Sequence, residues 1–298
     1  MKKMAKLILS LLVLGSIASC SESHFREDKV FAGGKFVTAK TLNKGKTLYT
    51  EFCMPCHGVN GDGKGVASKG MKVPPRDFTS GIFKFGKVLS GELPHDSHLF
   101  SILDNGLNGT AMLPWDLSEN QKEAVVQYIK TFAPKVWEGK DKELGAAVEL
   151  VKDPYGIAHQ GAAIKKGKEI YHGEANCQSC HRAYVGLGEL GKFTEEDPSE
   201  IDMEAYVQKP QETEWGFQNI PPDFTWDVVR SAKSVEDIAM RLASGVGGTS
   251  MPAWKDTITD DQIWAVAYYV KSLIEKKDTL ARKELMNAIK EENKKYGK

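Results

Sequence analysis

The stretch EFCMPCHGVNGDG, Glu51 to Gly63, places a histidine directly after two cysteines that are separated by two residues. Two thiols and an imidazole at this spacing suit a disulfide, half of a metal site or the covalent attachment of a haem. The choice depends on the other cysteines of the chain. The 298-residue sequence holds five cysteines, and those outside this stretch are Cys20, Cys177 and Cys180.

The second half of the chain repeats the first. GKTLYTEFCMPCH ends at His57 and GKEIYHGEANCQSCH ends at His181, and PPRDFT in the first half corresponds to PPDFT in the second. A Gly-x-x-Gly-Thr-x-Met pattern ends at Met112 and again at Met251, and a helix-like segment with matching Gln, Tyr and Lys follows each. The chain is therefore a duplication of one module of roughly a hundred residues, an ordinary domain size.

The repeat favours covalent haem over the other two interpretations. Apart from Cys20, every cysteine lies in a Cys-x-x-Cys-His motif, which is the attachment pattern of c-type haem. Its two thiols bind the porphyrin and its histidine ligates the iron from one face. A shared zinc site would join cysteine pairs separated by far more than the usual ~15–20 residues. It would also leave the two histidines unexplained. A thioredoxin-like pair needs only one motif in a βαβ setting, whereas the flanks here are helix-like. Simple structural disulfides are the remaining alternative. We expect two haem c groups, held by Cys53, Cys56, His57, Cys177, Cys180 and His181.

Each half resembles a class I cytochrome c domain, and the whole resembles exported dihaem cytochromes c built from two such domains. The shared motifs span about residues 40 to 275 and recur in the same order. The resemblance implies an all-α fold of two tandem cytochrome c-like helical domains, each around a covalently bound haem. It also implies that the protein transfers electrons.

The repeat divides the chain into six segments. We expect a lipoprotein signal peptide at 1–19, a tether at 20–40, cytochrome c domain 1 at 41–133, a linker at 134–160, cytochrome c domain 2 at 161–275 and a charged tail at 276–298. Apolar periodicity predicts helices at about 42–52, 96–105, 118–132, 162–173, 234–244 and 259–275. The tail is predicted to be a solvated helix.

The sixth ligand of each iron decides what the haem can do. A methionine opposite the histidine closes the site and raises its potential, whereas an open position would admit peroxide. Only Met112 and Met251 occupy the same place in both repeats, after glycines that let the backbone approach a porphyrin. We therefore expect them as iron ligands. Packing in the core is their alternative role, and His98 or His172 is the alternative ligand.

The resemblance implies further supporting residues. A proline carbonyl is expected to accept the second ring N–H of each ligand histidine, from Pro74 or Pro75 and from Pro221 or Pro222. Other residues are expected near the haem: Trp115 and Trp254 at its edges, Arg76 at a propionate, and Tyr128 and Tyr269 at a propionate or in the core.

The amino terminus predicts export. Lysines precede an apolar run, Leu7 to Ala18, which is shorter than the ~20 residues that a membrane-spanning helix needs. The residues from Ile17 to Cys20 resemble a bacterial lipobox, so we expect Cys20 to carry lipid. The mature protein is then expected in the periplasm, anchored by lipid to the inner or outer membrane.

The predicted function is electron transfer by a membrane-anchored dihaem cytochrome c, not catalysis. Its expected partners are redox proteins of respiratory or dehydrogenase complexes. The alternatives are a dihaem peroxidase-type enzyme and an electron-delivering subunit of a larger oxidoreductase complex. Basic and acidic residues number 40 each, so no overall field favours nucleic acid. A basic segment at 64–90 and an acidic one at 193–216 predict two different partners.

Overall fold

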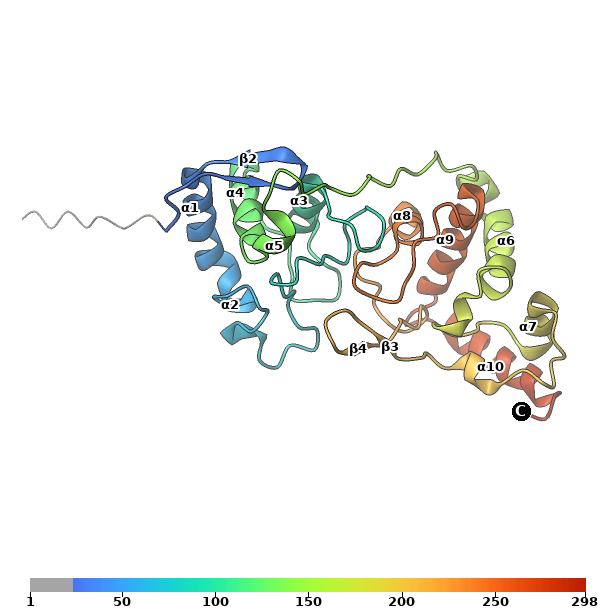
Figure 1. The fold of residues 1–298 in the computed structure, drawn as a ribbon. Helices are drawn as coiled ribbons and strands as arrows, with labels where there is room; N and C mark the ends of the chain where they lie inside the picture. The colour runs from blue at the N-terminus through green and yellow to red at the C-terminus, as the bar shows by residue number, and fades with distance from the viewer. Residues whose placement is uncertain (1–23) are drawn as a thin grey trace, which may run out of the picture.

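The computed structural model describes residues 24–298. Two groups of helices form two domains, coloured blue to green and yellow-green to red in Figure 1. The described strands are short and form two antiparallel hairpins, β1 (Lys29–Phe31) with β2 (Lys35–Val37) and β3 (Gln211–Glu212) with β4 (Gln218–Asn219). The predicted all-α fold in two tandem domains is confirmed. Cys20 and the predicted signal peptide lie outside the described residues.

All six predicted helices are present. The first domain contains α1 (Ala39–Leu48), the π-helical turn η2 (Tyr49–Cys53), α2 (Met54–His57), η3 (Val66–Ser68), α3 (Asp96–Asn105), α4 (Glu119–Lys130) and α5 (Pro134–Trp137). The second contains η4 (Ile157–His159), α6 (Gln160–His172), η5 (Cys177–Ser179), α7 (Leu187–Thr194), η6 (Met203–Tyr206), α8 (Val235–Ser244), α9 (Asp260–Ile274) and α10 (Leu280–Lys294).

The repeated glycine before each Cys-x-x-Cys-His motif allows two helices to cross closely. A Cβ on Gly45 of α1 would lie 2.0 Å from the carbonyl oxygen of Ala124 in α4. A Cβ on Gly167 of α6 would lie 2.0 Å from the carbonyl oxygen of Ala265 in α9. No side chain fits at either crossing, so both domains are built on the same helix pair.

The repeated glutamine has a local role at the start of the second helix of each pair. The backbone N–H of Ser118 donates to Gln121 Oε1 at 2.9 Å, and that of Thr259 donates to Gln262 Oε1 at 2.8 Å. Each is half of a capping box, which satisfies N–H groups that a helix leaves free at its start.

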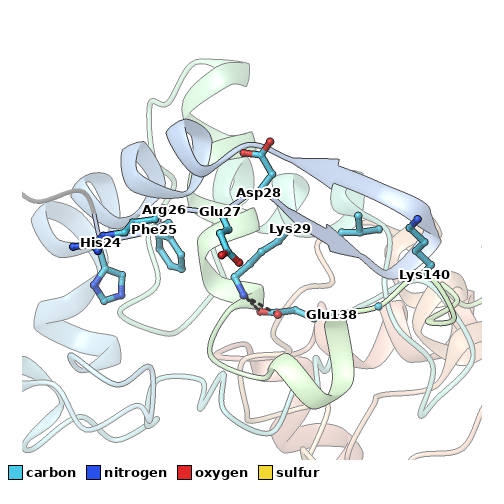
Figure 2. A pocket seen from close by; sticks show the side chains of 10 residues that line it. His24, Phe25, Arg26, Glu27, Asp28, Lys29, Glu138 and Lys140 are labelled. Atoms are coloured by element: carbon cyan, nitrogen blue, oxygen red, sulfur yellow. Dashed lines mark hydrogen bonds and ion pairs between the residues drawn. The ribbon is translucent and has the colours of Figure 1, made fainter.

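The described part of the predicted tether is folded onto the first domain. Phe31 of β1 is fully buried and packs in one apolar cluster with Trp137 of α5. Figure 2 shows Lys29 reaching Glu138, and their charged atoms lie 2.7 Å apart. The β1–β2 hairpin therefore belongs to the first domain and is not a free tether.

The predicted linker and tail are also packed against the domains. The backbone N–H of Val148 donates to the Lys87 carbonyl at 3.0 Å, while the Val148 side chain packs against the core of the second domain. In the tail, Asn293 of α10 is buried and its Oδ1 accepts from the Leu187 N–H at 2.9 Å. The tail forms the predicted helix, but one of its faces is docked on the second domain, so it is solvated only on its outer face. Among residues 24–298 no helix is both long and apolar enough to cross a membrane.

Candidate haem-binding sites

Each motif histidine is held through its Nδ1 atom. His57 Nδ1 lies 3.0 Å from the carbonyl oxygen of Arg76, and His181 Nδ1 lies 3.1 Å from that of Pro222. Donation of the Nδ1–H to a carbonyl leaves Nε2 as the metal-binding nitrogen. The expected carbonyl of Pro222 is confirmed. In the first domain the acceptor is Arg76, so the expectation of Pro74 or Pro75 was wrong.

The repeated Asp-Phe-Thr motif that follows the acceptor explains why Arg76 and Pro222 are equivalent. Phe78 stacks on His57 with ring centroids 4.5 Å apart, and Phe224 stacks on His181 at 4.6 Å. The aspartate closes the turn, because the backbone N–H of Thr79 donates to Asp77 and that of Thr225 donates to Asp223, each at 2.8 Å. The motif thus fixes both the acceptor and the face of the imidazole.

The tyrosine before each motif fixes its other end. Tyr49 donates its hydroxyl to the carbonyl of Gly58 at 2.7 Å, and Tyr171 donates to that of Arg182 at 3.0 Å. Both acceptors directly follow the motif histidine. The repeated position of the two tyrosines is visible in the sequence, but the sequence analysis missed their hydrogen bonds to the backbone.

Burial sets the protonation of the motif residues. It lowers the pKa of His57 and His181, against the opposing effect of the carbonyl hydrogen bond. Neutral imidazole is therefore favoured, and this is the form that ligates metals. Burial, with a smaller effect of the neighbouring cysteine, raises the pKa of Cys53 and of Cys177 to about 12.

The arrangement of the cysteines does not support the rival interpretations. Cys53, Cys56, Cys177 and Cys180 are all free, so the disulfides considered above are not formed. Within the described residues, no group of three or more His, Cys, Asp or Glu side chains is arranged to hold a metal ion, as a shared zinc site would require.

The two methionine loops have the same internal hydrogen bonds. The N–H of Met112 donates to Thr110 Oγ1 at 3.1 Å, and the N–H of Met251 donates to Thr249 Oγ1 at 3.2 Å. Each threonine hydroxyl in turn donates to a carbonyl three residues earlier, at 2.8 and 2.7 Å. The loops begin at Gly106 (φ +62°), where a Cβ would lie 2.6 Å from the carbonyl oxygen of Met112, and at the equivalent glycine of the second copy.

The second domain contains a cavity that fits a haem. Its volume is ≈ 1130 Å³, and its walls include Cys177, Cys180, His181, Met251 and Trp254. Arg241 also lines it, and the Nε and Nη1 atoms of this residue are buried without a partner among the described residues. A buried cationic donor pair suits a carboxylate such as a propionate. In the first domain, Cys53 and Met112 pack against one apolar cluster.

Other expected neighbours of the haem are placed differently. His172 is buried with its Nδ1 2.9 Å from the Lys168 carbonyl, and its Nε2 accepts from the Tyr184 N–H at 3.0 Å. Both nitrogens are therefore used by the backbone, so His172 is not an iron ligand. His98 packs against His95 with ring centroids 5.4 Å apart.

The aromatic residues and the arginine that were expected near the haem lie partly at the cavity and partly elsewhere. Trp254 lines the cavity as expected, and Trp115 packs against Phe52 with ring centroids 5.6 Å apart. Tyr128 and Tyr269 are buried among other aromatic rings, which is the core role considered for them. The guanidinium of Arg76 lies over the ring of Trp215 at 4.0 Å, a contact the sequence did not predict.

Comparison with known proteins agrees with this geometry. The family profile described as cytochrome C oxidase, cbb3-type, subunit III matches twice, at residues 40–129 and 162–270. A solved chain of the reducing HAO-like protein complex of Kuenenia stuttgartiensis is similar, with 31% sequence identity and a TM-score of 0.61. The match covers 78% of this chain and 96% of that one. No curated protein matches. Because the two profile matches together cover more than half of the sequence, the chain belongs to this family of c-type cytochromes, with two copies of the domain in tandem.

Proposed function

We propose that the protein is a dihaem electron carrier in which His57 and Met112 would hold one haem iron, and His181 and Met251 would hold the other. Bound haem supplies an iron that changes between the ferrous and ferric states. The chain supplies the rest: Nε2 of each histidine as one ligand, a thioether as the other, and an apolar wall that excludes water. A His–Met pair stabilises low-spin iron with a raised potential, which suits electron transfer.

The observation that carries this proposal is the equivalence of the two methionine loops. Both hold the methionine N–H on a threonine hydroxyl and both begin with a glycine at positive φ. A peroxidase would need one site whose distal side is open to peroxide. Two loops with the same hydrogen bonds favour two closed sites.

The similar solved chain favours a subunit of a larger complex over a free electron carrier. Its complex is described as a reducing HAO-like protein complex, so a chain similar to this one occurs there within a larger assembly. We propose that this chain likewise delivers electrons within or to a larger oxidoreductase complex. On this proposal it is exported to the periplasm and held at a membrane by lipid on Cys20.

Spectroscopy of the holoprotein separates the carrier from the peroxidase. We expect a ferric spectrum without a high-spin component and no peroxide consumption when hydrogen peroxide and a reductant are supplied. Affinity purification from mildly solubilised membranes then separates a free carrier from a complex subunit. A high-spin haem that turns over peroxide would overturn the carrier proposal.

The membrane anchor is tested by Cys20→Ser. Removing the thiol should prevent lipid attachment and move the protein from the membrane fraction to the soluble periplasmic fraction, because on this proposal the acyl chains on Cys20 are the anchor. Both forms should have the same haem spectrum. An unlipidated variant that stays firmly bound would show that something other than the lipid anchors the protein.

A further inference from the structure

The β3–β4 hairpin of the second domain reaches the first domain. In Figure 1 it lies between the two groups of helices, beside loops of the first domain. Its turn carries Trp215, whose Nε1–H donates to Ser80 Oγ at 3.2 Å. The Arg76 guanidinium lies 4.0 Å from the centre of the indole ring and Lys84 Nζ lies 5.3 Å from it. One tryptophan therefore contacts three residues of the other domain.

On the side of the first domain, these contacts lead to the proximal ligand. The carbonyl of Arg76 is the acceptor for His57 Nδ1 at 3.0 Å. The residue whose side chain stacks on Trp215 thus also orients the imidazole of the first site. Any shift of the indole would act on the residue that fixes His57.

On the side of the second domain, the same ring contacts the loop of the distal ligand. A Cβ on Gly248 would lie 2.2 Å from Cη2 of Trp215, so the indole lies directly on this glycine. The Gly248 carbonyl accepts the Glu214 N–H at 3.1 Å, and the next residue, Thr249, holds the N–H of Met251. Trp215 is therefore packed between the proximal side of the first site and the distal loop of the second.

A backbone hydrogen bond also joins the methionine loop of the second domain to the loop of the first domain that contains Lys84. The N–H of Gly247 donates to the carbonyl of Lys84 at 3.1 Å, which ties the methionine loop of the second domain to the first domain. The cavity of the second domain is partly lined by Lys84 and Phe85, so it faces the first domain. The two sites thus share one interface, and Trp215 is packed within it.

We propose that Trp215 is the positioning residue for electron exchange between the two haems, an inference that rests on the proposed function. In this step one ferrous iron gives up one electron and becomes ferric, while the ferric iron of the other haem becomes ferrous. No bond forms or breaks and no proton moves. Trp215 holds Arg76 and the loop around Gly248 at fixed positions relative to each other. It thereby fixes the distance and orientation between the two haems.

The test measures how fast an electron equilibrates between the haems of the holoprotein after flash reduction by a small photoreductant. Trp215→Ala should slow this step several-fold, because the rate of electron tunnelling falls exponentially as the distance between the two haems increases. Trp215→Phe, which keeps a ring beside Arg76, should restore most of it. Gln218→Ala is the matched control, since Gln218 is an exposed residue of the same hairpin.

Two further readouts separate positioning from simple damage. The absorption spectra of both haems should keep their wild-type form in Trp215→Ala, which shows that the ligands stay bound, while hydrogen exchange at the amides of Glu214 and Gly247 should speed up. An unchanged equilibration rate in Trp215→Ala, or an equal loss in Gln218→Ala, would overturn the proposal for Trp215 and leave electron transfer itself intact. Wild-type haems that do not cycle reversibly would instead refute the proposed function.

Discussion

Thr110 and Thr249 perform the same task at equivalent positions of the two domains. Each hydroxyl accepts the N–H of the methionine two residues later and donates to a carbonyl of the same loop. The threonine therefore stiffens the loop that would present the proposed thioether ligand. This gives a reason for a threonine in the repeated Gly-Thr-x-Met, which the sequence shows but does not explain.

Thr249→Val should loosen the loop of the second domain. Valine keeps the branched shape but removes both hydrogen bonds, so the sulfur ligand should dissociate from the iron at a lower temperature. Thr249→Ser keeps the hydroxyl and is the control. The measurement follows the weak ferric band at the red end of the spectrum on heating. Equal bleaching temperatures for the valine and serine variants would show that the hydroxyl does not hold the loop.

At the scale of residues, the side chains of the haem-attachment motif could be predicted, but the backbone carbonyls that accept hydrogen bonds from them could not. The cysteines and histidines are fixed by the spacing that haem attachment needs, so Cys53, Cys56 and His57 can be identified directly. The carbonyl acceptor of His57 has no side-chain signature, because any residue carries a carbonyl. Arg76 and Pro222 share only their place before Asp-Phe-Thr, and that place proved decisive.

At the scale of elements, the crossing of α6 and α9 depends on one glycine. Gly167→Ala would place a Cβ 2.0 Å from the Ala265 carbonyl oxygen and force the helices apart. Overpacking of this kind typically costs about 1–3 kcal/mol. Gly161→Ala in the same helix meets no atom within 4 Å. It should be neutral or stabilise the protein by up to ~1 kcal/mol, because alanine favours a helix over glycine.

Chemical denaturation of both variants measures this difference. The prediction is that Gly167→Ala unfolds at a lower denaturant concentration than wild type, while Gly161→Ala unfolds at the same concentration or higher. If the two variants unfolded together, the close crossing at Gly167 would not be needed for stability.

The elements whose packing was predicted and those whose packing was missed differ in what buries them. The repeated helices bury an apolar stripe against their own domain, so periodicity identified them. The helix α10 docks through Ile289 and Asn293, which are buried, and through the partly buried Leu285 and Met286. These residues recur at helical spacing, but the many charged residues between them obscure this face in the sequence. The β1–β2 hairpin is short, and its burial depends on Trp137, which is distant in sequence.

At the scale of the whole molecule, the two charged segments partly face each other. Arg76 and Lys84 belong to the basic segment and Trp215 to the acidic segment, and all three meet at the domain interface. Sequence predicted a separate external partner for each segment. These residues are instead used between the domains, since charge along a chain does not reveal what a segment faces after folding. The other charges of both segments remain a prediction for external partners.

The interface should make stability depend on pH. Burial, followed by the charges of Arg76 and Arg230, lowers the pKa of Lys84 from 10.5 to about 8. Between these values the unfolded chain binds more protons at this residue than the folded one. The contribution of Lys84 to the free energy of unfolding should therefore rise with pH across this window.

Denaturation of wild type and Lys84→Met at pH 8 and pH 10 checks this contribution. The free energy of unfolding of wild type should rise relative to that of Lys84→Met between pH 8 and pH 10. Lys64→Met, at an exposed position of the same basic segment, should keep the wild-type dependence. A pH dependence that Lys84→Met shares with wild type would assign the effect to other groups.

The central claim is that each domain holds one haem between a histidine and a methionine. The most direct measurement is a redox titration of Met112→Ala and Met251→Ala, with the ferric sulfur-ligation band recorded for each. Loss of a thioether should lower the potential of one haem, within the ~0.8 V over which axial ligands move haem potentials, and leave the other haem unchanged. Each variant should also lose part of the band, and together the two losses should account for all of it. A band that persists at full strength in either variant would show that its methionine is not a ligand, and would contradict the account.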